Sequence, residues 1–463
     1  MRNLKAGLLP MYIDLYDRVL PGIRMEMEEF YRTIAREFAR RGVEVVSVPV
    51  CRVASEFHSA IGRFENDGVD AIVTLHLAYS PSLESADALA SSRLPIIVLD
   101  TTPDSRFDHN QDPERILYNH GIHGVQDLCS VLLRKGKRFQ IEVGHWEKTD
   151  VLERVVGWIR AACLAAAMRS ARVGLVGKPF ACMGDFAVPF DVLKSNIGIQ
   201  TIALDSSRFS SILNEVDDRS IDAEITSDQD QFHMDGLDVD LHRCATKTSM
   251  ALREWLKRER LCAFTMNFLS IDEYSELPTV PFLEASKAMA RGLGYAGEGD
   301  VLTAALVGSL LSVYPETTFT EMFCPDWDGD SIFLSHMGEV NLRVLVDTAK
   351  LKPCAFPFTN VTTPVIGVGR YKPGDALLVN LAPGPGEGFR LFAAPVTLLD
   401  VYGEDRLADS IHGWFRPGLP IADFLAHYSR GGGTHHLALV YGAKAQEIAR
   451  FGEVMEWQTT VLG

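Results

Sequence analysis

Short β-branched runs alternate with amphipathic patterns through the first third of the chain, and this alternation constrains the fold more than any other feature. Three runs predict buried strands, at Val43–Val50, Asp70–Leu77 and Pro95–Thr101. The intervening segments Ile23–Arg41 and Ser55–Asp67 predict helices. Such βαβ alternation indicates a parallel, doubly wound sheet with helices on both faces. No Gly-x-Gly-x-x-Gly follows the first strand, so a dinucleotide-binding domain is not indicated.

The alternation restarts after a long helix expected at Asp150–Ser170. The elements expected in this second region are the strands Arg172–Gly177, Ile199–Asp205 and Ala263–Ile271 and the helix Lys247–Arg258. These patterns predict a second α/β domain that begins near residue 171.

The pattern changes again from about Thr318, where the helical signal fades. Proline, glycine and alternating strands such as Ala376–Leu381 and Arg390–Leu398 dominate through Val440. We therefore predict two doubly wound parallel-sheet domains, residues 1–170 and 171–317, followed by a mostly β C-terminal domain, residues 318–463.

Charge and composition favour a small-molecule ligand. The formal net charge of −16 argues against a nucleic-acid partner, because such binding depends on Lys and Arg neutralising phosphates. Eight cysteines occur without a Cys-x-x-Cys pair, which indicates reduced core thiols rather than zinc ribbons or disulfides. Charged residues interrupt the apolar N-terminus, and no later window is long and apolar enough to span a membrane. We expect a cytoplasmic protein with no membrane partner.

Four short segments of the last third contain groups suited to metal binding. They contribute Glu298, Glu321, His336 and the adjacent pair His435 and His436. Each alone is also compatible with a surface glutamate or a satisfied core histidine. Together they would form a mixed oxygen and nitrogen site that suits Mn, Co or Mg. If the adjacent histidines lie on an extended strand, only one can face the ion, and the other would contact substrate or support a ligand.

Two other local motifs have simpler explanations. Asp326–Asp330 begins like a calcium loop, but Ser331 replaces the required glycine and Met337 the required bidentate glutamate, so a hairpin turn is favoured. Gly384–Gly388 could cradle a phosphate, but no helix signal follows it, and a flexible loop between strands is the better interpretation.

At the candidate metal residues the chain resembles the L-arabinose isomerase family over nearly its whole length. The segment Gly294–Asp300 is similar to the family's signature around its first metal-binding glutamate. Glu321 lies in a Thr-x-x-x-Glu context, and His336 in Ser-His-Met-Gly-Glu, like the family's second and third ligands. Gly432–His436 resembles the family's Gly-Gly-Ala-His-His, whose second histidine is the ligand. The order and separations also agree.

The resemblance implies a metal-dependent aldose–ketose isomerase that acts on a pentose or (deoxy)hexose through an enediol. Glu298, Glu321, His336 and His436 would bind one divalent ion per subunit, with Mn expected and Co or Mg as alternatives. Glu298 and Glu321 would also be the catalytic acid and base.

The resemblance also implies a substrate site shared between subunits of a homo-oligomer, a hexamer in the family. Asn119–Gly124 resembles a segment that contributes a histidine, here His123, to a neighbouring subunit's site. Met183 and Phe268 match positions that pack against the sugar, although ordinary core packing would explain them equally well. His435 would be a further substrate contact.

Two departures from the family affect the sugar-binding half of the site. Val125-Gln126-Asp127 stands where arabinose isomerases usually have Gly-Arg-Glu, and the family's Gln-His-Leu-Tyr segment has no counterpart in Pro10–Tyr16. We therefore expect a sugar other than L-arabinose itself.

Two alternative functions use the same residues. An epimerase or lyase could employ the same metal and carboxylates on a sugar carbonyl. A non-catalytic sugar-binding relative could retain the fold without turnover.

Overall fold

The computed structural model describes residues 3–463 and divides into two compact units. One unit ends at Cys163, and the other runs from Leu164 to Gly463. The helix α7 (Val151–Arg169) contains the boundary between them.

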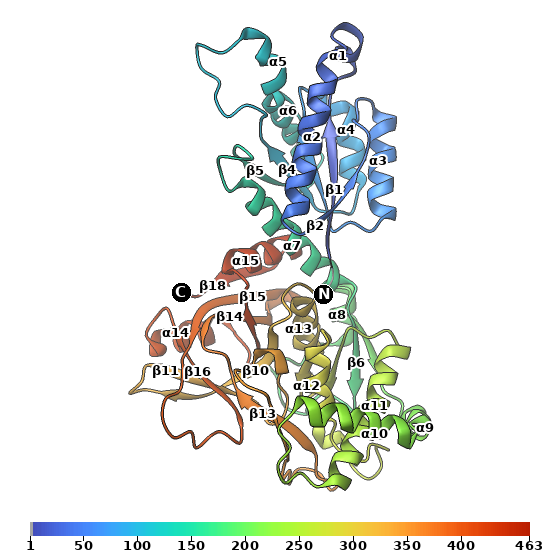
Figure 1. Ribbon diagram of the computed structural model, residues 1–463, viewed down its shortest axis with the longest axis vertical. Helices are drawn as coiled ribbons and strands as arrows, with labels where there is room; N and C mark the ends of the chain where they lie inside the picture. Colours follow the sequence, from blue (N-terminus) through green and yellow to red (C-terminus); the bar gives the residue numbers. More distant parts are fainter. Residues whose placement is uncertain (1–2) are drawn as a thin grey trace. The chain divides into compact units, whose positions relative to one another are not determined.

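The first unit is built around a parallel sheet with the strand order β2-β1-β3-β4-β5, and helices flank it (Figure 1). Its strands are β1 (Leu4–Met11), β2 (Val43–Ser47), β3 (Ala71–His76), β4 (Ile96–Asp100) and β5 (Gln140–Val143). Its helices are α1 (Asp14–Val19), α2 (Ile23–Arg40), α3 (Ala54–Asn66), α4 (Ser82–Ser91), α5 (Ile116–Asn119) and α6 (Gly121–Arg134), with the 3-10 turn η1 (Pro113–Arg115). Every residue of β3 is buried, as expected for a strand covered on both faces.

The second unit begins with another parallel sheet, of order β7-β6-β8-β9. Its strands are β6 (Arg172–Val176), β7 (Gln200–Ala203), β8 (Ala263–Met266) and β9 (Gly294–Gly297). Its helices are α8 (Phe190–Asn196), α9 (Ser206–Glu215), α10 (Asp218–Gln231), α11 (Val239–Arg258), α12 (Phe282–Ala290) and α13 (Val301–Val313), with the 3-10 turn η2 (Phe268–Ser270). α13 is apolar and buried along most of its length, since it packs against the parallel sheet and against the strands that follow it.

The rest of the second unit is a mostly antiparallel sheet that closes on itself. Its strands are β10 (Thr317–Asp326), β11 (Ser331–Ser335), β12 (Lys350–Pro353), β13 (Val365–Arg370), β14 (Gly374–Pro383), β15 (Phe389–Leu398), β16 (Ile411–Pro417), β17 (His436–Tyr441) and β18 (Gln458–Val461). The order β16-β11-β10-β17-β14-β15 ends where β15 pairs with β16, which makes a barrel. The helices α14 (Ile421–Gly431) and α15 (Ala445–Met455) and the 3-10 turns η3 (Leu342–Val344) and η4 (Pro385–Glu387) complete this part.

The predicted fold class is confirmed: two parallel α/β sheets precede a mostly β region. Barrel closure was not predicted, because it depends on pairing between β15 and β16, which no local pattern indicates. The helix predicted from Lys247 begins at Val239, and the strand predicted through Ile271 ends at Met266. Within the described residues, no helix is long and apolar enough to cross a membrane.

Candidate metal centre

The candidate ligands lie on strands of the second unit or directly after them. Glu298 directly follows β9, and His336 directly follows β11. Glu321 lies within β10, and His436 is the first residue of β17. Glu321 pairs in register with His436, so both side chains leave the same face of the barrel wall. Residues separated by more than a hundred positions are thereby brought together.

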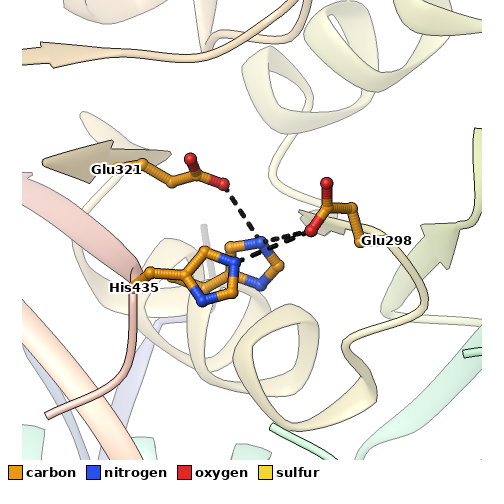
Figure 2. A group of neighbouring side chains, drawn as sticks. Glu298, Glu321 and His435 are labelled. Carbon is orange, nitrogen blue, oxygen red and sulfur yellow. Dashed lines mark ion pairs between the residues drawn. The ribbon is translucent and has the colours of Figure 1, made fainter. Parts of the chain in front are cut away.

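Glu298, Glu321, His435 and His436 each direct one potential ligand atom into a common space, where these atoms all lie within 4.8 Å of one another. The distance from His436 Nε2 to Glu321 Oε1 is 3.1 Å, and that to Glu298 Oε2 is 3.4 Å. His435 Nε2 lies 3.6 Å from the same Glu298 oxygen. Figure 2 shows the labelled side chains of Glu298, Glu321 and His435 converging.

His336 lies beside this group rather than within it. Its Nε2 is 3.3 Å from Glu321 Oε1, and its ring packs on the backbone of Gly297, where an added Cβ would lie 3.2 Å from the ring carbon Cε1. Three of the four expected ligands therefore meet in the group, with His435 as its fourth member, while His336 contacts one of them.

A left-handed turn directs Glu298 toward the group. Glu298 has φ of 62° and Gly299 has φ of 84°, so two successive residues adopt a conformation that ordinary side chains disfavour. A Cβ at Gly299 would approach the Cα of Pro179 to 2.5 Å, so glycine is required there. Asp300 then caps α13 by accepting the Thr303 backbone N–H at 2.9 Å. Strain of this kind is typical of functional sites.

Each of the three imidazoles has a carboxylate at its Nδ1 atom. Asp300 lies 2.9 Å from His436 Nδ1, Glu339 lies 2.6 Å from His336 Nδ1, and Asp185 lies 2.7 Å from His435 Nδ1. An ionised carboxylate only accepts hydrogen bonds, so each Nδ1 donates and each Nε2 is left toward the group. Carboxylates orient metal-binding histidines in this way in many metalloproteins.

Aromatic rings enclose the histidines. The Phe186 ring stacks on His436, with ring centroids 4.9 Å apart and planes 11° apart. Phe319 packs edge-on against both His336 and His436. These contacts restrict the two buried imidazoles and limit the access of water to them.

The carboxylates and imidazoles of the group shift one another's pKa values in favour of their charged forms. Burial raises the pKa of Glu298, but the imidazoles of His435 and His436 outweigh it and bring that pKa down to about 2. Burial likewise raises the pKa of Glu321, yet His336 and His436 hold it well below its ordinary value. Burial lowers the pKa of His336, whereas Glu339 and Glu321 raise it, to about 10. A divalent ion that bound the imidazole nitrogens would displace the protons on them, so metal binding would release protons.

Two buried atoms indicate that the group suits a cation. Glu298 Oε2 and His436 Nε2 are buried and form no hydrogen bond with any part of the chain that the structure describes. These two atoms lie 3.4 Å apart as an ion pair, and they also face Glu321 and His435, so a cation could bind here in place of the imidazole protons. A divalent metal that accepts oxygen and imidazole ligands fits both atoms.

The remaining expected site residues lie elsewhere. His123 belongs to α6 of the first unit, where its ring packs edge-on against His120. Met183 lies on the loop between β6 and α8, two residues before Asp185. Phe268 begins η2 and packs against the rings of Phe180, Phe356 and Phe358. The sugar-contact role of these three residues stays a prediction.

Several residues of the centre were not selected from the sequence. Asp300 and Glu339 lie inside the motifs that identified Glu298 and His336, so their proximity along the chain was a usable signal. Asp185 and Phe186 offered no such signal, because their contacts with the histidine pair span about 250 residues.

Strand alternation would separate His435 from His436 only if both lay on an extended strand, and the structure does not meet this condition. His435 precedes the first residue of β17, and its backbone N–H donates to Asp185 instead of to a neighbouring strand. Both rings consequently face Glu298, with centroids only 4.2 Å apart.

The two competing motifs are connections between strands. Asp326–Asp330 forms the turn between β10 and β11, in which Asp326 accepts the Gly329 backbone N–H at 3.0 Å. Gly384–Gly388 connects β14 to β15 through η4. The hairpin turn expected for the first is confirmed.

Family models and curated relatives both indicate one family. The model of the L-arabinose isomerase central domain matches residues 194–314, and that of the L-arabinose isomerase C-terminal domain matches residues 316–458. L-arabinose isomerase of Herpetosiphon aurantiacus is 23% identical over 89% of this chain and 84% of its own length. The enzyme of the same name from Thermotoga sp. (strain RQ2) is 22% identical over 90% of this chain and 86% of its own length. That from Geobacillus thermodenitrificans is 24% identical over 94% of this chain and 90% of its own length.

We predict that Gly297→Ala weakens Mn binding roughly tenfold, as is typical when the support of a metal ligand is disturbed. The new methyl group would press on the His336 ring and displace its Nε2. Isothermal titration of metal-free protein with Mn would measure the effect. Gly62→Ala in α3 is the control, since nothing lies within 4 Å of a Cβ there. Unchanged affinity in the Gly297 variant would argue that His336 does not bind the metal.

Proposed function

This chain belongs to the L-arabinose isomerase family as a divergent member, and we propose that it is a metal-dependent isomerase that interconverts an aldose sugar and its ketose. The observation that carries the metal requirement is the meeting of two carboxylates with a buried imidazole, whose potential ligand atoms lie within 4.8 Å of one another. We propose Glu298, Glu321, His336 and His436 as the ligands of one divalent ion, with Mn the expected metal.

The proposed reaction moves one proton between C1 and C2 of the sugar and another between their oxygens. One carboxylate, of Glu298 or Glu321, removes the proton from C2 of the aldose and returns it at C1. The other carboxylate moves the proton between O1 and O2 through an enediol of the sugar. A bound divalent ion supplies Lewis-acid polarisation and offsets the charge that develops on the sugar oxygens.

The remaining groups would hold the substrate. His435 is the most exposed of the three histidines, with 39% of its side chain accessible, so a sugar hydroxyl can reach it. We propose Met183 and Phe268 as apolar contacts for the sugar carbons. The substrate class is a pentose or a (deoxy)hexose.

The structure of the first unit supports a preference for a sugar other than L-arabinose. Asp127, one of the residues that depart from the family pattern, accepts the Ser82 backbone N–H at 3.0 Å and the Ser82 hydroxyl at 2.9 Å. It therefore caps the start of α4 instead of presenting a free carboxylate.

We further propose that the protein is a cytoplasmic homo-oligomer, with a hexamer expected from its family. His123 lies in the first unit and the candidate ligands in the second. In the proposed assembly, His123 of one subunit completes the sugar site of the next.

The first prediction is that chelator-treated protein produces no ketose and that Mn or Co restores production. A panel of pentoses, hexoses and deoxyhexoses with added Mn would identify the substrate. Proton and carbon NMR in deuterated water would show the carbonyl moving between C1 and C2 with deuterium incorporated at carbon. Inversion of a single centre would indicate an epimerase, cleavage of the skeleton a lyase, and sugar binding without turnover a non-catalytic relative. Full activity in metal-stripped protein would refute the metal requirement.

The second prediction concerns the two carboxylates. Glu298→Gln and Glu321→Gln should each lower kcat about 10²–10⁴-fold at saturating Mn, because an amide cannot accept the proton. Glu273→Gln, at an exposed glutamate, is the control and should leave kcat unchanged. A near-normal kcat in either site variant would exclude that residue as acid or base.

The third prediction tests the contribution of His123 to a neighbouring subunit. His123→Ala and Glu298→Gln should each be impaired alone, whereas mixed oligomers should regain activity where an intact His123 meets an intact metal site. Mass spectrometry would confirm subunit exchange. His58→Ala, at another exposed histidine of the first unit, should remain active alone. A protein that stays monomeric, or mixed oligomers without recovery, would refute the shared site.

A further inference from the structure

The loop between β6 and α8, residues 177–189, contacts both histidines of the pair that begins β17. Asp185 Oδ2 accepts the His435 backbone N–H at 3.0 Å and lies 2.7 Å from His435 Nδ1. The next residue, Phe186, stacks on the His436 ring. Two consecutive residues of one loop therefore hold two consecutive histidines.

We propose that Asp185 is a positioning residue that fixes the orientation and the tautomer of His435, so that His435 Nε2 is presented to the sugar. This inference rests on the proposed function. Asp185 itself would not touch the substrate, and it acts through the imidazole that it holds.

The hydrogen bonds determine which ring nitrogen carries the proton. The Asp185 carboxylate has only acceptor atoms, so Nδ1 of the neutral His435 ring must be the protonated nitrogen. The Nε2 lone pair then faces Glu298 Oε2 across 3.6 Å. A sugar hydroxyl bound beside these two atoms could donate to His435 Nε2. The second bond, from the His435 backbone, prevents the ring and carboxylate from moving independently.

Exposure separates this pair from the two other pairs of histidine and carboxylate, of which the side chains of His336 and Glu339 are 6% and 1% exposed. Asp300 and the His436 side chain are both fully buried. The side chains of Asp185 and His435 are 38% and 39% exposed. A buried pair of histidine and carboxylate suits a histidine that binds the metal. An exposed pair at the edge of the group can be reached by a substrate. This difference argues for a substrate-facing role of His435 rather than a fifth metal ligand.

The base of the loop is fixed to the catalytic turn. The Phe180 backbone N–H donates to the Glu298 carbonyl at 2.9 Å, and Asn267 Nδ2 donates to the Lys178 carbonyl at 2.9 Å. The loop thus contacts the backbone of Glu298 at one end and His435 at the other. These bonds fix the position of Asp185 relative to the Glu298 carboxylate, which lies on the Nε2 side of the His435 ring.

The kinetic test compares Asp185→Ala, Asp185→Asn and the control Asp191→Ala, which removes an exposed acid at the start of α8. Loss of a charge-assisted hydrogen bond should raise KM for the sugar about tenfold in Asp185→Ala, while kcat changes less than threefold and Mn affinity is unchanged. Asp185→Asn retains an acceptor and should keep KM near that of the wild type, as should the control. Unchanged KM in Asp185→Ala, or a loss of Mn affinity, would overturn the proposal.

A double-mutant cycle tests whether Asp185 acts through His435. The variant Asp185→Ala/His435→Ala should have the same KM as His435→Ala alone, because the carboxylate has nothing left to position. Additive effects would show that Asp185 acts in another way and would refute the inference.

A spectroscopic readout is independent of turnover. In metal-free protein with ¹⁵N-labelled histidine, at a pH where His435 is neutral, its nitrogen shifts should report a proton on Nδ1, with the signals assigned from His435→Ala. Asp185→Ala should move the proton to Nε2, and Asp185→Asn should not. An unchanged tautomer in Asp185→Ala would overturn the proposal. If the wild type shows no isomerase activity, the proposed function fails, and these spectra still decide the role of Asp185.

Discussion

The register between β10 and β17 is the constraint on which the site depends. It places Glu321 directly opposite His436 in a sheet that closes into a barrel. A one-residue slip would move one of these side chains to the other face of the wall and separate the carboxylate from the imidazole. Barrel closure opposes such a slip, because each strand of the ring is paired on both sides. The barrel therefore contributes the rigid half of the centre, and the turn after β9 contributes Glu298.

Carboxylates and imidazoles alternate in the part of the centre that the barrel contributes. Each imidazole lies between a carboxylate at Nδ1 and another at Nε2, as with His436 between Asp300 and Glu321. Burying the two proposed acid and base groups would be costly without these partners. The partners that accept from Nδ1 remain available when a cation binds at Nε2, so they can orient the ligands in both states.

Local sequence patterns were sufficient for the order of the α/β elements but not for all of their limits. The helix α11 begins at Val239, well before the predicted Lys247, because Asp238 accepts the backbone N–H groups of Asp240 and Leu241 and caps it. Its first turns look polar in the sequence, yet His242 is buried there against Asp228 of α10. The strand expected to continue through Ile271 ends early because the Asn267 side chain accepts the Leu269 N–H and starts a 3-10 turn. In each case a side-chain hydrogen bond, rather than hydrophobic periodicity, sets the limit.

The candidate site likewise contains residues that the sequence predicts and residues that it does not. Glu298, Glu321, His336 and His436 could be predicted because each occurs in a short motif that resembles a known family. The contact of Asp185 with His435 could not, since it joins a loop of the parallel sheet to the start of a barrel strand. The membership of His435 in the four-residue group was also missed, because it depends on the chain leaving the extended conformation just before β17.

The left-handed conformation of Glu298 has a consequence for engineering this protein. Glutamate in that conformation costs roughly 1–2 kcal/mol relative to an unstrained backbone, a cost that glycine at the same φ of 62° would largely avoid. A design procedure that optimised only the folded state would therefore tend to replace Glu298 and raise the melting temperature. The resulting protein would fold more stably and would lack the carboxylate proposed to bind the ion and move the proton, so thermostabilised variants should be chosen with position 298 held constant.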